Sequence, residues 1–153
     1  MRIIAIDGPS GAGKSTYAAS LGLPIVPTDH FATWDDPVAW WPRLVDGVIR
    51  PLRRGEPGRY RRMDWGSGVP VLGAEVVVPP TEVLVVEGVS SGRRAAMSWL
   101  SQLVWVEAED MLERAVARDG EASRAELLRW KEFERGWFQV DGTRQRADLV
   151  VQR

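Results

Sequence analysis

The chain has 153 residues, the size of one domain, with 44% hydrophobic and 27% charged residues, as is typical of a globular protein. Its net charge of −1 gives no general attraction to nucleic acid or to an anionic membrane. The absence of cysteine and the presence of one histidine, His30, exclude disulfides, thiolate sites and multi-histidine metal sites. No apolar run is long enough for a membrane span or a signal peptide, so we expect a cytoplasmic location and neither membrane nor nucleic-acid partners.

Apolar runs and helical spacing alternate along the chain. Short apolar runs predict strands at residues 2–7, 24–28, 83–87, 103–106 and 147–151. Helical spacing predicts helices at residues 14–21, 36–54, 109–118 and 123–138, with Asp36 as N-cap and Pro37 at the first position of the second helix. This alternation predicts a single α/β domain over residues 1–153, a three-layer sandwich with a five-stranded parallel sheet.

A long segment without this alternation runs from residue 55 to about residue 80. It is rich in glycine, proline and arginine, and long loops of this kind are usually functional or mobile. Within it, residues 69–78 are compatible with a short hairpin that turns at Gly73. We therefore expect a mobile insertion here.

A glycine-rich motif links the first strand to the first helix. The sequence GPSGAGKS at residues 8–15 matches the phosphate-binding pattern G-x-x-x-x-G-K-S, and it lies between a strand and a helix, as that pattern requires. Glycines there let backbone N–H groups turn toward an anion, the lysine reaches the β- and γ-phosphates, and the serine hydroxyl can bind Mg²⁺. The motif predicts binding of a nucleoside triphosphate and Mg²⁺ in a P-loop fold. The expected nucleotide-binding residues are Gly8, Ser10, Gly11, Ala12, Gly13, Lys14, Ser15 and Thr16.

Charged residues later in the chain could complete such a site. Glu87 ends the run VLVVE, where an acid beside the phosphate loop would orient the metal, although it could instead cap the strand. Arg114 and Arg118 lie four residues apart on one helical face and could bind transferring phosphoryl oxygens. They could equally form a solvated face that pairs with Glu109 or Glu113.

The acceptor side of the predicted site follows the second strand. Asp29 would lie at the carboxyl end of that strand, where an acid can take the proton of an attacking hydroxyl, although a simple turn would explain it too. His30 and a group of aromatic residues, among them Trp34 and Tyr60, follow closely. Planar rings could stack on a flat acceptor or belong to the core.

These motifs, in this order, resemble the uridine kinase-like P-loop nucleoside kinases. The matching pieces are IIAIDGPSGAGKST, TDHF, WDDPVAW, GRYRRMD, VLVVEG and RAVARD. The resemblance implies an ATP-dependent kinase that phosphorylates a hydroxyl of a nucleoside or a similar small molecule.

The resemblance also implies roles for particular residues. Asp29 matches the acid that activates the acceptor hydroxyl, Glu87 matches the acid near the metal, and Arg114 and Arg118 match arginines of a short lid around residues 114–123. The implied acceptor-binding residues are His30, Phe31, Trp34, Asp35 and Tyr60, and Arg146 would flank the adenine. The 55–80 segment would lie on the acceptor side.

Two other functions are compatible with the sequence. A nucleoside monophosphate kinase would use the arginines around residues 53–62 to bind the acceptor phosphate. A nucleotide-dependent regulatory protein would use the 55–80 segment as a switch. The identity of the acceptor, the choice between ATP and GTP, and the oligomeric state stay open at this stage.

Overall fold

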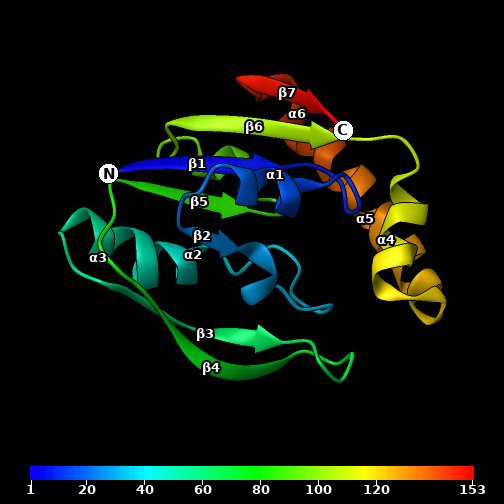
Figure 1. Cartoon of the computed structure of the whole chain (residues 1–153), viewed down its shortest axis with the longest axis horizontal. Helices are drawn as coiled ribbons and strands as arrows, with labels where there is room; N and C mark the ends of the chain where they lie inside the picture. Colours follow the sequence, from blue (N-terminus) through cyan, green and yellow to red (C-terminus); the bar gives the residue numbers. More distant parts are fainter.

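The computed structural model describes all 153 residues and has a five-stranded parallel sheet at its centre (Figure 1). The strand order is β2-β5-β1-β6-β7, and every neighbouring pair is parallel. The strands are β1 (Arg2–Asp7), β2 (Ile25–Pro27), β5 (Val83–Glu87), β6 (Gln102–Glu107) and β7 (Leu149–Gln152). The predicted sheet and its strand number are confirmed, and the carboxyl ends of all five strands lie at one edge, beside α4 and α5.

Helices connect these strands and cover both faces of the sheet. They are α1 (Lys14–Ser20), α2 (Trp41–Leu44), α3 (Arg50–Arg53), α4 (Met111–Asp119), α5 (Arg124–Asp141) and α6 (Thr143–Arg146), with a π-helical segment at Val45–Ile49 between α2 and α3. None of them is both long and apolar enough to cross a membrane.

Alternate residues of the central strands build a core on each side of the sheet. Ile3 and Leu84 face the helical segment that contains Leu44 and Ile49, in a cluster of 16 buried residues. The neighbouring positions, such as Val85, face α1 in a second cluster of six buried residues. Burial on both faces explains why these strands read as continuous apolar runs in the sequence.

The helix predicted at residues 36–54 begins later than expected. Asp36 is not its N-cap: its Oδ1 accepts the Ala39 N–H at 2.8 Å, and its own N–H donates to Thr33 Oγ1 at 2.9 Å, so it closes a tight loop. The helix begins at Trp41, and Pro42 takes the first-turn place that we assigned to Pro37. A capping residue and a proline are signals of turns as well as of helix starts, which is why the predicted N-cap, Asp36, lies four residues before the observed one, Trp40.

The hairpin is larger than the predicted one and turns elsewhere. β3 (Gly58–Asp64) pairs with β4 (Val71–Val78), and the connection runs through residues 65–70. Gly73 is therefore inside a strand, near an irregularity in the register between Arg61 and Met63, where a glycine commonly occurs. Most of the 55–80 segment thus forms a two-stranded sheet, which lies below the main one in Figure 1.

Glu107, at the end of β6, joins three elements at the edge of the sheet. Its carboxylate accepts two bonds of 2.9 Å from Arg144 of α6, one of 2.6 Å from Trp105 Nε1, and one from Gln152 of β7. The hydrogen bonds from Arg144, above all, lower the pKa of Glu107 from 4.5 to about 2. Because the folded pKa is depressed, this contact stabilises the protein above about pH 4.5, and the stabilisation disappears as the pH falls toward 2.

We therefore expect Glu107→Gln to lower the free energy of unfolding at pH 7 by about 1 kcal/mol, a modest value because Arg144 is half exposed. The difference from the wild type should shrink as the pH is lowered from 7 to 3, as measured by urea denaturation at a series of pH values. A difference that is the same at every pH would contradict an ionic contribution from Glu107.

Candidate functional site at the carboxyl edge of the sheet

The phosphate loop between β1 and α1 has the backbone that its glycines predict. Gly8, Gly11 and Gly13 all have positive φ angles, of 143°, 82° and 91°. A Cβ on Gly8 would lie 2.1 Å from the Val106 carbonyl oxygen, and one on Gly11 would lie 2.0 Å from that of Met111. The first two glycines are therefore required for close packing against β6 and α4, which adds to the reason that we gave from phosphate access.

The end of the loop offers donors to an anion. The backbone N–H groups of Gly13, Lys14, Ser15 and Thr16 have no acceptor within the protein, as expected at the start of a helix. Lys14 is 8% exposed, and its Nζ donates to the Pro9 carbonyl at 2.8 Å, so its ammonium lies across the loop. Free N–H groups and a lysine at a helix start together form an anion-binding site.

The side chains of Ser15 and Glu87 bring two oxygen atoms that could bind a metal ion close together beside the phosphate loop. Ser15 Oγ donates to Glu87 Oε2 at 3.2 Å. Burial raises the pKa of Glu87, and the nearby Lys14 acts in the opposite direction. Mg²⁺ prefers hard oxygen ligands and keeps several waters, so this pair fits Mg²⁺ if phosphate and water supply the other ligands. The structure contains no group of three or more acidic or histidine side chains that could bind a metal ion by themselves, so ligands from phosphate and water would be needed.

Asp29 lies at the carboxyl end of β2, in a short turn at Thr28–His30. Its side chain is exposed, and its charge is near enough to influence the pKa values of Glu87, Arg118 and His30. Trp65 of the hairpin connection donates from Nε1 to the Asp29 carbonyl at 2.9 Å, which fixes the backbone there. The structure thus brings the predicted acceptor-side acid and the predicted metal-side acid to one edge.

The two arginines of α4 point to the same edge. Arg114 Nη2 lies 3.3 Å from the position that a Cβ on Gly13 would occupy, directly beside the phosphate loop. Arg118 binds Asp119 at 2.7 Å, and its charge reaches Glu87 as well as Asp29. The alternative pairing with Glu113 does not form, because Glu113 binds Arg124 of α5 instead.

Aromatic residues gather near the turn that contains Asp29. Trp34 is 43% exposed and lies edge-on to Trp65 and Trp130, with ring centroids 5.1 and 6.0 Å away. Tyr60 OH lies 2.7 Å from His30 Nδ1 and is itself nearly buried. Burial, together with the nearby Arg62, lowers the pKa of His30. The predicted acceptor residue Asp35 lies on the surface next to Trp34.

The structure corrects the expected role of Phe31. Phe31 is 1% exposed, and it packs against Trp40 and Tyr60, with ring centroids 5.4 and 4.6 Å away. It belongs to the core and offers no surface to a ligand. Its place next to His30 in the sequence did not reveal this, because neighbouring residues in a tight turn point in different directions.

Ser10 and Arg146 both have hydrogen-bond partners within the protein. Ser10, expected to bind the nucleotide, gives its N–H and its hydroxyl to Glu134 of α5, at 3.0 and 2.5 Å. Arg146, expected beside the adenine, binds Asp141 and the Gly92 carbonyl, so its guanidinium is engaged in joining α6 to the loop after β5.

Two features of the site were missed in the sequence. Asp7, at the end of β1, is fully buried and accepts N–H groups of Gly8, Ser90 and Gly92 at 2.7, 3.1 and 2.8 Å, while burial raises its pKa to about 6. An acid that closes an apolar strand was the available signal. The second feature is the contact of α5 with Ser10, and its one available signal was a rare lysine, Lys131.

Comparisons with known proteins agree with this geometry at the level of the fold. No protein-family model and no curated protein matches the sequence. Solved structures do match, although their sequence identity is low.

Three of the similar structures cover nearly the whole chain. A possible uridine kinase from Bacillus stearothermophilus has 16% identity and a TM-score of 0.64, over 97% of this chain and 87% of its own. A candidate fructose transport system kinase from Silicibacter sp. TM1040 has 20% identity and a TM-score of 0.62, over 98% and 89%. D-glycerate 3-kinase from Cryptococcus neoformans has 10% identity and a TM-score of 0.63, over 99% and 86%. The chain therefore has the fold of the uridine kinase-like P-loop kinases.

Proposed function

We propose that the protein is an ATP-dependent kinase that transfers the γ-phosphate of ATP to a hydroxyl of a small molecule, a nucleoside or a similar compound. The observation that carries this proposal is the meeting of the phosphate loop, the Ser15–Glu87 pair and Asp29 at one edge of the sheet. Phosphoryl transfer needs positioned phosphates, stabilised charge and an acceptor for the hydroxyl proton, and each of these tasks has a residue here.

On the nucleotide side, the free N–H groups of the loop and Lys14 would bind the phosphates, and Ser15 and Glu87 would hold Mg²⁺. A bound Mg²⁺ would neutralise charge that develops on the phosphate oxygens. Arg114 and Arg118 would bind those oxygens from the α4 side, since both guanidiniums lie at this edge.

On the acceptor side, Asp29 would take the proton of the attacking hydroxyl. Trp34 supports a flat acceptor, because its exposed ring stands at a fixed angle beside Trp65 and Trp130, where a planar group could stack. His30, Tyr60 and Asp35 would contact the remaining polar groups of the acceptor. Two of the similar structures are named as kinases of hydroxylated small molecules, uridine and D-glycerate, which is in keeping with a hydroxyl acceptor.

The hydrogen bonds of the arginines in residues 53–62 argue against a phosphate group on the acceptor. Four of them already have partners away from Asp29: Arg53 with Trp99, Arg54 with Glu56, Arg59 with Glu75, and Arg61 with the Gly73 carbonyl. Arg62 alone lies near His30 and Tyr60. One arginine is a small set for a phosphate, which is usually bound by several donors.

The regulatory alternative receives less support from the hairpin. Tyr60 and Val78, one on each strand of the hairpin, belong to the main core cluster. A switch segment that orders and disorders would have to remove both side chains from that core.

The test is a screen for ATP consumption with nucleosides, nucleoside monophosphates and other small hydroxylated metabolites, with the Lys14→Ala variant as the blank. We expect one nucleoside-like acceptor to raise Lys14-dependent ADP release well above the background without acceptor. Preference for the monophosphate over the nucleoside would favour the monophosphate kinase. Binding of ATP without turnover of any acceptor would favour the regulatory protein.

A further inference from the structure

The two lysines of the chain meet the phosphate loop at neighbouring carbonyl groups. Lys14 Nζ donates to the Pro9 carbonyl, and Lys131 Nζ, on α5, donates to the Ser10 carbonyl. All other basic residues of the chain, apart from His30, are arginines. An ammonium has three rotatable donors on a compact charge, so it can bind a carbonyl and an anion at once. The Lys131 ammonium therefore lies against the phosphate loop, as the Lys14 ammonium does, and has donors left for an anion.

One turn of α5 fixes this arrangement. The Glu134 side chain is 3% exposed, and its Oε1 accepts both the N–H and the hydroxyl of Ser10. Trp130 Nε1 donates to the same hydroxyl at 2.8 Å. Glu134 Oε2 has no hydrogen-bond partner and lies 3.6 Å from Lys131 Nζ. A buried carboxylate in this position holds both the loop and the ammonium in place.

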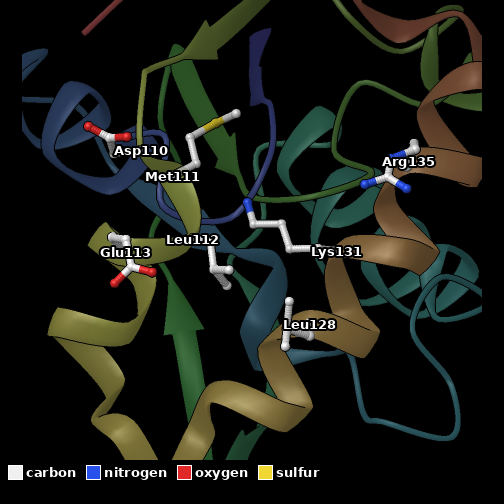
Figure 2. A pocket seen from close by; sticks show the side chains of 7 residues that line it. All are labelled: Asp110, Met111, Leu112, Glu113, Leu128, Lys131 and Arg135. Atoms are coloured by element: carbon white, nitrogen blue, oxygen red, sulfur yellow. The ribbon is translucent and has the colours of Figure 1, made fainter.

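Positive charge gathers where Lys131 meets the loop. Burial is the main cause that lowers the pKa of Lys131, and the charges of Lys14 and Arg118 lower it further, while Glu134 raises it. Lys14 of α1 and Arg118 of α4 thus act on the Lys131 ammonium as like charges, and an anion bound beside it would offset their repulsion. Figure 2 shows the Lys131 side chain extending from α5 toward the loop after β1.

We propose that Lys131 is a second phosphate-binding lysine, whose ammonium binds a γ-phosphoryl oxygen of the triphosphate while Glu134 and Ser10 hold it in position. The proposal rests on the proposed function, because it presupposes that the loop binds ATP. The proposal goes beyond that function because it adds a phosphate-binding cation from α5 to Lys14 of the loop and to the arginines of α4. A contact with the γ-phosphoryl group is absent with ADP, so its loss should weaken ATP binding selectively.

The experiment measures binding by calorimetry, with Mg²⁺ and either a non-hydrolysable ATP analogue or ADP. In Lys131→Gln the side chain keeps N–H donors but loses the charge. We expect this variant to bind the analogue about 10-fold more weakly, as for the loss of one charge-assisted hydrogen bond, and to bind ADP within about 3-fold of the wild type. Arg129→Gln makes the same charge change on the same helix, at an exposed residue that pairs with Glu126, and should alter neither affinity.

The possible outcomes distinguish a failure of the Lys131 proposal from a failure of the proposed function. Equal weakening for both ligands, or no weakening, would overturn the proposal and leave the proposed function standing. A wild type that binds neither ligand would overturn both. If Lys131→Gln is unstable because Glu134 loses its cation, the double variant Lys131→Gln/Glu134→Gln removes both charges, and the same selective loss of analogue affinity is expected.

Discussion

Lys14→Ala should reduce phosphoryl transfer by about 10²–10³-fold or more and leave the fold intact. The ammonium lies across the phosphate loop, 2.8 Å from the Pro9 carbonyl and within reach of a bound phosphate, so its removal takes a full charge away from the site. The side chain is nearly buried at the edge of the sheet and belongs to none of the apolar core clusters. Transfer is measured as acceptor-dependent ADP release, and folding as the thermal midpoint.

Lys14→Arg is the matched variant for this prediction. It keeps the charge but replaces the compact ammonium with a larger planar group at a position that is only 8% exposed. We expect transfer to stay well below that of the wild type. If Lys14→Ala kept more than about a tenth of the activity, the loop would not be the phosphate site that its motif indicates.

The parts of the molecule that could be predicted are those whose signals are local. The phosphate loop is a contiguous motif, and strands buried on both faces, such as Val83–Glu87, read as apolar runs whatever surrounds them. The acids Asp29 and Glu87 followed from the same logic, because residues at the carboxyl ends of parallel strands share an edge. That Asp29 and Glu87 lie at the same edge could be predicted without knowing how the helices pack.

The hairpin and the α5 contact could not be predicted in this way. β3 contains three arginines and buries only Gly58 and Tyr60, so its sequence lacks an apolar alternation, and its partner strand comes after an irregular connection. Ser10 and Glu134 are 124 residues apart and carry no motif. Contacts of this kind depend on how α5 docks, which is decided by the whole core rather than by any local pattern.

Asp29→Asn should lower the turnover number by about 10²–10⁴-fold and leave the affinity for Mg²⁺–ATP within about 3-fold of the wild type. The substitution is nearly isosteric, but an amide cannot take the proton of an attacking hydroxyl. Because the Asp29 side chain is exposed and Trp65 is bound by its carbonyl, the turn after β2 should keep its geometry. The measurements are steady-state kinetics with the acceptor found in the screen, and calorimetry with the non-hydrolysable analogue.

Asp35→Asn provides the comparison within the same segment. If Asp35 binds hydroxyl groups of the acceptor, its variant should raise the KM for the acceptor and keep most of kcat, the opposite of the pattern at Asp29.

Unchanged turnover in Asp29→Asn would remove Asp29 from the role of base, and the proton would then have to go to another group near the acceptor. His30 is the nearest candidate, since its lowered pKa leaves the imidazole neutral at pH 7 and able to accept a proton. A loss of activity on acidification through the pKa of His30 in that variant would identify it.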